Sequence, residues 1–226
     1  MKDDIYRNCA AAILAGGKSL RMGEDKAGLT WEGKTFLERI AGELGNFPAR
    51  FVSLGAEQDS SEGQVRQMPE GQTPEGQVRQ MPEGQTPEEQ VPEGWTVIRD
   101  RYADAGPMAG IGAVLEASPF PWVFVVSCDM PRVNPAVAEY LWEYAAEGTD
   151  LVVPAAEDGR RHMTCALWNR SALPVIRRRL REGDSRLYTL CGEMQTVSVP
   201  VNEKIAQAVE NINTPEAYLR LKGTGE

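Results

Sequence analysis

Histidine, cysteine and long apolar runs are all scarce in this sequence of 226 residues. Any Ser-His-Asp hydrolase would have to use the single histidine, His162, and no G-x-S-x-G motif is present to supply a nucleophile. With one histidine and no C-x-x-C pair, a zinc site would lack its usual ligands. No apolar run approaches the roughly 18 residues that a membrane-spanning helix needs. These absences argue against serine hydrolases, zinc enzymes and integral membrane proteins.

An excess of positive charge is absent as well. The formal net charge is −9, so we expect no nucleic-acid binding, which needs a basic surface. Cys9, Cys128, Cys165 and Cys191 are predicted to be reduced thiols of a cytoplasmic protein. The apolar run CAAAILA at 9–15 has the character of a short signal core. We favour a buried first strand, because that interpretation also accounts for the loop behind it.

A thirteen-residue repeat interrupts the chain. Residues 62–74 read EGQVRQMPEGQTP, and 75–87 repeat the same letters. The segment 58–94 holds five prolines, five glycines and no aromatic residue, so it cannot bury enough apolar surface to offset the entropy lost on ordering. We predict a single domain over 1–226 with a flexible insertion at 58–94. A partner-binding role is the alternative, although the repeat carries no recognisable motif.

Short apolar runs alternate with helical patterns over the rest of the chain. The run WVFVVSC at 122–128 has no polar alternation, which is typical of a parallel strand covered on both faces. We predict a single Rossmann-like α/β domain, a doubly wound and mostly parallel sheet with helices on both faces and ligands at the carboxyl ends of the strands. The predicted strands are 8–14, 50–55, 95–99, 122–128, 150–154, 163–168 and 196–201, and the predicted helices are 35–45, 109–117, 134–147, 171–182, 186–192 and 214–222.

The first predicted strand ends in a glycine-rich, cationic loop. Gly16 and Gly17 have no Cβ, so the backbone there can approach a ligand closely and bare its N–H groups to an anion. Arg21 and Lys26 add positive charge, and Gly23 relieves the turn between them. The set suits a polyphosphate, whereas two glycines alone would favour a tight βα turn with surface cations. Neither a P-loop nor a dinucleotide fingerprint is present.

Two aspartates follow other predicted strands. Asp129 comes directly after the run at 122–128 and is well placed to hold Mg²⁺, which takes few protein ligands and keeps its water and phosphate. Asp100 follows WTVIR in a similar setting. A turn of small residues, formed by Gly106, Pro107, Ala109 and Gly110, lets a base or ribose lie close to backbone amides. Each feature also has a purely structural interpretation, as a turn aspartate or as the beginning of a helix.

Five segments of the sequence carry a specific resemblance. They are LAGGKSLRMGEDK (14–26), DRYADAGPMAGI (100–111), VVSCDMP (125–131), GRRHMTCALWNRSALP (159–174) and NINTPE (211–216). Together they resemble, in the right order, the molybdenum cofactor guanylyltransferases of the MobA-like nucleotidyltransferase family. The resemblance covers nearly the whole chain outside the insertion. Met163 stands where family members often carry proline after the histidine.

The resemblance implies a nucleotide site, a metal site and a second-substrate site. It implies that Arg21, Lys26 and Asp129 are catalytic, with Asp129 as the Mg²⁺ ligand. The implied nucleotide-binding residues are Leu14, Ala15, Gly16, Gly17, Arg21, Gly23, Lys26, Asp100, Pro107, Ala109, Gly110 and Asp129. The candidates for the second substrate are His162, Arg186, Asn211 and Asn213, of which the histidine could be structural and the asparagines could be helix caps.

The sequence therefore predicts a Mg²⁺-dependent nucleotidyltransferase with GTP and molybdopterin as substrates. Loops of the sister cytidylyltransferases usually resemble L-A-A-G and end in P-K, so LAGG with Asp25-Lys26 favours the guanylyl branch. A cytidylyltransferase remains the nearest alternative. A noncatalytic carrier of GTP or molybdopterin is another, and molybdoenzyme maturation proteins are open as partners.

Overall fold

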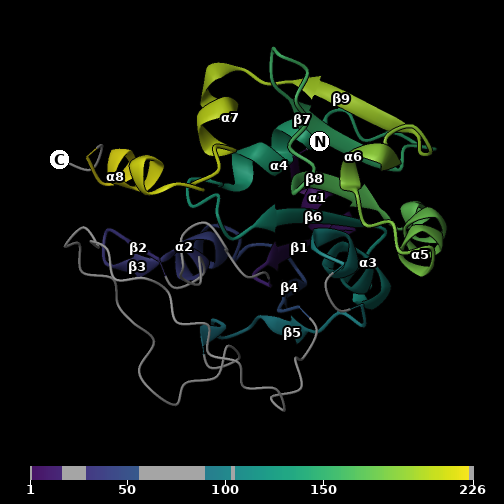
Figure 1. Cartoon of the computed structure of the whole chain (residues 1–226), viewed down its shortest axis with the longest axis horizontal. Helices are drawn as coiled ribbons and strands as arrows, with labels where there is room; N and C mark the ends of the chain where they lie inside the picture. The colour runs from purple at the N-terminus through teal and green to yellow at the C-terminus, as the bar shows by residue number, and fades with distance from the viewer. Residues whose placement is uncertain (1, 17–28, 56–89, 103–104, 224–226) are drawn as a thin grey trace, which may run out of the picture.

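A computed structural model describes residues 2–16, 29–55, 90–102 and 105–223, and in it helices pack around one large sheet (Figure 1). The sheet contains β1 (Cys9–Leu14), β4 (Arg50–Ser53), β5 (Thr96–Ile98), β6 (Trp122–Ser127), β7 (Leu151–Ala155), β8 (Cys165–Asn169) and β9 (Thr196–Pro200). The helices are α1 (Lys2–Asn8), α2 (Phe36–Glu43), α3 (Pro107–Ala117), α4 (Pro135–Trp142), α5 (Leu173–Arg181), α6 (Leu187–Leu190), α7 (Glu203–Ala208) and α8 (Pro215–Gly223), with a 3₁₀ turn η3 (Arg170–Ala172).

The strands of the sheet follow the order β5-β4-β1-β6-β8-β7-β9. β1 pairs in parallel with both β4 and β6, β4 with β5, and β7 with β9. β8 runs antiparallel to both of its neighbours. The predicted doubly wound, mostly parallel sheet is therefore confirmed. Because β8 alone is reversed, its first residues lie at the same edge as the last residues of the other six strands.

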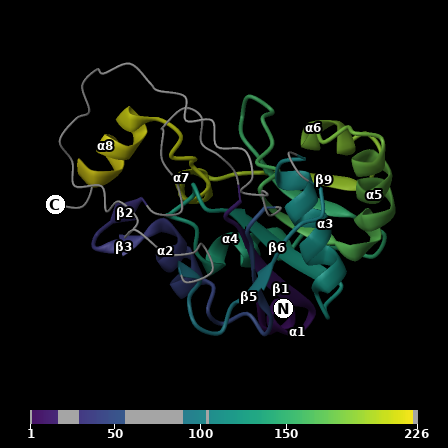
Figure 2. The same ribbon diagram turned by 60° about the horizontal axis from the view of Figure 1, so that its bottom comes forward.

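Apolar side chains from both faces of the sheet form two cores. On one face, Ile5 of α1 and Ile40 of α2 pack with α4 and α7. On the other, Ile111 of α3 and Ile176 of α5 pack against the alternate residues of the same strands. Figure 2 shows α3 and α5 together on one side of the sheet. Strand residues are buried on both faces, which explains the apolar run without polar alternation at 122–127.

A third, smaller core joins the C-terminal helix to the N-terminal third of the chain. β2 (Thr30–Trp31) and β3 (Lys34–Thr35) form a hairpin that was not predicted. Ala217 and Leu221 of α8 pack against Leu29 and Phe36 beside this hairpin. Both views show α8 next to β2 and β3 (Figures 1 and 2). Segments from the N-terminal third and from the C-terminal helix thus pack together in this third core.

The predicted strands and helices all occur, with ends that shift by a few residues. Asn134 caps α4 by accepting a hydrogen bond from the amide of Ala136, and Pro135 occupies the first helical position. Residues 56–89 lie outside the described part, so flexibility of the insertion stays a prediction. Within the described residues, Val91 packs against the first core. No described helix combines the length and the apolar character that crossing a membrane requires.

Candidate functional site at the carboxyl edge of the sheet

The carboxyl ends of β1 and β6 bring Leu14 and Asp129 to the centre of one sheet edge. Leu14 lies opposite Ser127 in the parallel register, and the amide of Cys128 donates a hydrogen bond of 3.0 Å to the carbonyl of Leu14. Asp129 follows at once and is buried, with 8% of its surface exposed. This edge is where parallel sheets bind ligands, and β1 lies where the strand order changes direction.

The C-terminal segment reaches the same point. The amide of Ile212 donates a hydrogen bond of 2.8 Å to the carbonyl of Asp129. Asn211 and Asn213 flank Ile212, so the structure brings the two predicted second-substrate asparagines beside the predicted metal ligand. Thr214 caps α8, because its hydroxyl accepts a hydrogen bond from the amide of Ala217. The asparagines are therefore not needed as caps of that helix.

Gly16 is required by a close approach of two backbones. A Cβ at this position would lie 2.2 Å from the amide nitrogen of Gly55, in the chain that continues from β4. Gly110 of α3 is equally confined, because a Cβ there would lie 2.7 Å from the hydroxyl oxygen of Ser53 and 3.1 Å from Leu14. Both glycines keep α3, β1 and β4 close together under the edge. These packing roles explain the two glycines without a ligand, so their predicted contact with a nucleotide stays a prediction.

The beginning of α3 lies at the same edge, beyond β4 and β5. Gly106 has φ of 60°, which favours glycine, and exposed Pro107 follows as the first residue of the helix. The side chain of Ala109 is buried in the second core. Backbone groups of the turn, rather than the Ala109 methyl group, are thus the part that a ligand could reach.

Asp100 is half-buried two residues after β5. Its Oδ1 is buried and has no hydrogen-bond partner among the described residues. Burial raises the pKa of the Asp100 carboxyl, although a backbone hydrogen bond at Tyr102 lowers it. A buried, unsatisfied carboxylate oxygen is costly, so a ligand that donates a hydrogen bond would be favoured there. No signal in the sequence distinguished this oxygen from that of any other strand-end aspartate.

His162 lies at this edge because β8 is reversed. Its amide donates to Pro154 at the end of β7, and two residues later the carbonyl of Thr164 accepts from Ser127. Burial lowers the pKa of His162, and nearby Arg160 lowers it further. Both effects favour the neutral imidazole, although nearby Asp158 raises the pKa. Met163, which replaces the proline common in the resembled family, packs in the second core.

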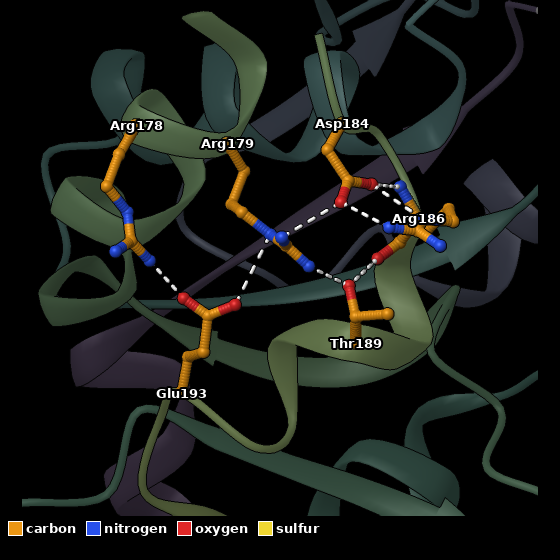
Figure 3. Close-up of polar contacts among 6 residues, drawn as sticks. All are labelled: Arg178, Arg179, Asp184, Arg186, Thr189 and Glu193. Carbon is orange, nitrogen blue, oxygen red and sulfur yellow. Dashed lines mark hydrogen bonds and ion pairs between the residues drawn. The ribbon is translucent and has the colours of Figure 1, made fainter. Parts of the chain in front are cut away.

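Arg186 is held by a network of charged side chains rather than left free. Its guanidinium donates two hydrogen bonds to Asp184, from Nε at 2.9 Å and from Nη2 at 2.7 Å. These bonds hold the pKa of the Asp184 carboxyl well below its usual range. Arg179 contacts Asp184 and Glu193, and Arg178 also contacts Glu193 (Figure 3). A phosphate group at Arg186 would have to compete with Asp184.

The described residues fit a Mg²⁺ ion held by the carboxylate of Asp129. They do not form a metal site with several protein ligands. The described residues contain no group of three or more His, Cys, Asp or Glu side chains that could hold a metal. Asp100 lies three strands from Asp129, about 14 Å at the usual strand spacing, so one ion cannot bind both. Mg²⁺ commonly takes one or two carboxylates and completes its shell with water and phosphate. A single buried aspartate at a strand end is consistent with that habit.

Four predicted residues of the glycine-rich loop, Gly17, Arg21, Gly23 and Lys26, lie outside the described residues. The two ends of the loop are described. Ala15 donates from its amide to Ser53 at 2.8 Å. Leu29, the first described residue beyond the loop, is buried in the third core. The described ends thus connect the loop to β4 on one side and to the C-terminal helix on the other.

Comparison with known proteins identifies the family of this chain. The MobA-like NTP transferase domain matches residues 11–197. The chain belongs to the MobA-like NTP transferase family. Among curated MobA-like relatives, the probable molybdenum cofactor guanylyltransferase of Opitutus terrae is 30% identical, over 92% of this chain and 91% of the relative. That of Clostridium perfringens (strain ATCC 13124) is 27% identical, over 92% and 93%.

Solved structures show the same MobA-like fold. Molybdopterin-guanine dinucleotide biosynthesis protein A from Archaeoglobus fulgidus has a TM-score of 0.70 at 22% identity, over 95% of this chain and 97% of that one. The 2-C-methyl-D-erythritol 4-phosphate cytidylyltransferase from Thermus thermophilus has a TM-score of 0.60 at 18% identity, over 95% of this chain and 97% of that one. Rv0371C from Mycobacterium tuberculosis, solved in complex with manganese, has a TM-score of 0.61 at 17% identity, over 96% of this chain and 99% of that one.

Proposed function

We propose that this chain transfers GMP from GTP to molybdopterin, releases pyrophosphate and forms the guanine dinucleotide form of the cofactor. The observation that carries the proposal is the meeting of Leu14, Asp129 and Ile212 at the carboxyl edge of the sheet. It joins three of the five segments on which the resemblance rests, at the place where this type of sheet binds ligands. The names of the curated relatives support the guanylyl reaction.

In this reaction the terminal phosphate of molybdopterin attacks the α-phosphate of GTP in line. That phosphate is already ionised near neutral pH, so the chain need not supply a strong general base. Arg21 and Lys26 neutralise the triphosphate and the departing pyrophosphate, and the rate depends on their positions. Asp129 would hold Mg²⁺, which supplies charge neutralisation at the phosphate oxygens.

The nucleotide lies between the glycine-rich loop and the beginning of α3. Backbone groups of Leu14, Ala15 and Gly16 bind the base. Gly17 and Gly23 have no Cβ and so allow the backbone to approach the nucleotide closely. The buried Oδ1 of Asp100 accepts a hydrogen bond from the nucleotide, and Pro107, Ala109 and Gly110 supply the turn against which it rests.

Molybdopterin binds on the other side of Asp129. Asn211 and Asn213 approach from the C-terminal segment, and His162 approaches from the beginning of β8. Arg186 would act only after release from Asp184. The neutral imidazole of His162 can donate or accept a hydrogen bond but adds no positive charge.

The test is pyrophosphate release with molybdopterin, Mg²⁺ and each of GTP, CTP, ATP and UTP in turn. We expect GTP to be productive and the others to be poorer by up to roughly four orders of magnitude, because a site built to pair guanine leaves polar atoms unpaired with other bases. A preference for CTP would instead assign the chain to the cytidylyltransferases, whose fold it shares. Binding of GTP with less than one pyrophosphate released per chain would support a carrier.

A further inference from the structure

The C-terminal segment contacts two places of the chain that are far apart in sequence, the turn at 129–132 and the hairpin at Thr30. Ile212 holds the carbonyl of Asp129 at 2.8 Å. Glu210 pairs with Arg132 at 3.0 Å, three residues beyond Asp129. Tyr218 donates its hydroxyl hydrogen to the carbonyl of Thr30 at 2.6 Å, just after the described end of the glycine-rich loop. We call the residues Glu210, Ile212 and Tyr218 the C-terminal clamp.

Arg132 is itself oriented by an aromatic ring. Its guanidinium carbon lies 5.8 Å from the centre of the Trp31 ring, and that of Arg39 lies 3.9 Å from it. Cations over an indole face are attracted by its negative potential. The Arg132–Glu210 pair therefore links the hairpin, the turn after Asp129 and the C-terminal segment at one point. The matched family domain ends at residue 197, so the clamp lies beyond it.

We propose that the C-terminal clamp is a positioning element of the active site, with Arg132 and Glu210 as positioning residues that set Asp129 relative to the far end of the glycine-rich loop. The inference rests on the proposed function, in which Asp129 holds the metal and the loop holds the triphosphate. The clamp contacts the backbone of Asp129 and of Thr30, so its effect on a bound substrate is indirect.

The solvent exposure of the Arg132–Glu210 pair allows a positioning role to be distinguished from a role in stability alone. The side chains of Arg132 and Glu210 are 26% and 44% exposed, and exposed ion pairs add little to stability. Loss of the pair should therefore lower the melting temperature by only a few degrees. Displacement of a reacting group by about 1 Å, in contrast, can reduce a rate roughly 100-fold. A positioning pair is thus expected to affect metal binding and turnover far more than unfolding.

The experiment compares Glu210→Ala, Arg132→Gln and Arg132→Lys with wild type. Hydrogen exchange of the Ile212 amide reports whether the clamp holds the segment. Water-proton relaxation measures binding of Mn²⁺ in the presence of GTP, without turnover. Glu116→Ala is the matched control, because it removes the comparably exposed Arg177–Glu116 pair at 2.7 Å.

We expect Glu210→Ala and Arg132→Gln to speed exchange at Ile212 about 10-fold and to weaken Mn²⁺ binding about 5-fold or more, with melting temperatures within about 4 °C of wild type. Arg132→Lys should recover a large part of both, because it keeps the positive charge that pairs with Glu210 and lies near the Trp31 ring. Glu116→Ala should change neither.

Unchanged exchange at Ile212, or faster exchange with unchanged Mn²⁺ binding, would overturn the inference. A different comparison tests the proposed function. If Asp129→Ala binds Mn²⁺ as tightly as wild type does, Asp129 is not the metal ligand. In that case the clamp would have no metal site to position, and the exchange data would describe only a docked segment.

Discussion

Replacement of Gly16 by alanine tests the packing beneath the candidate site. The added Cβ would lie 2.2 Å from the amide nitrogen of Gly55 and 2.8 Å from the carbonyl carbon of Leu54. Ordinary nonbonded atoms lie roughly 3.5 Å apart, so the ends of β1 and β4 must separate by about 1 Å. Both neighbours are backbone atoms, which cannot swing aside as a flexible side chain would.

Overpacking of this kind costs about 1–3 kcal/mol. For a chain of this size each kcal/mol shifts the melting temperature by about 2–4 °C, so Gly16→Ala should lower it by roughly 2–12 °C. The same displacement moves the loop relative to Asp129, and we expect turnover to fall by up to about 100-fold.

Thermal unfolding followed by circular dichroism and pyrophosphate release are the two assays. Gly42→Ala is the control, because its added Cβ would meet no atom within 4 Å apart from its chain neighbours and the backbone of its own helix, and alanine favours the helix α2. That variant should melt at or slightly above the wild-type temperature. If Gly16→Ala also melts at the wild-type temperature and keeps its turnover, the close approach of Gly16 and Gly55 is wrong.

Three further predictions follow from the same edge of the sheet. Asp129→Ala should reduce Mg²⁺-dependent turnover by roughly two orders of magnitude or more with an unchanged circular-dichroism spectrum, and near-normal rates would remove Asp129 from the mechanism. Deletion of 62–87 leaves about 16 residues between β4 and β5, which is enough for a parallel crossover. The melting temperature should therefore stay within a degree or two of wild type, and a larger loss would mean that the repeat packs against the domain. Asp100→Asn should stabilise the protein at pH 7. Burial raises the pKa of the Asp100 carboxyl in the folded state, so its contribution to folding stability is lost as the pH rises above the unfolded-state pKa of about 3.9. The gain should shrink towards pH 3.5, and an equal gain at both pH values would contradict the assigned cause.

Long periodic and apolar segments made most of the fold predictable. β6 and α3 could be recognised because each carries its own pattern of burial. α1 and α7 were missed because helices of seven and six residues are not stable alone and form through packing of Ile5 and Ile205. For α7 a signal existed, since Asn202 before an acidic residue is a typical helix cap.

The hairpin and the reversal of β8 show two further limits. Glu32 and Gly33 have φ of 49° and 78°, and Glu-Gly is a weaker turn signal than Asn-Gly. The direction of β8 leaves no mark on its residues, because a buried strand is apolar in either direction. The site followed from strand ends and from the resemblance, whereas Arg132 and Glu210 are 78 positions apart and carry no shared motif.

The hydrogen bond from Tyr218 to Thr30 also orders events during protein synthesis. The two residues are 188 positions apart, so at about 5–20 residues per second roughly 10–40 s pass between their additions to the nascent chain. Until Ile212 has left the ribosome, the carbonyl of Asp129 lacks its hydrogen bond from the amide of that residue. Nascent chains, and chains that stop before Asn211, therefore lack this contact and both asparagines proposed for the second substrate.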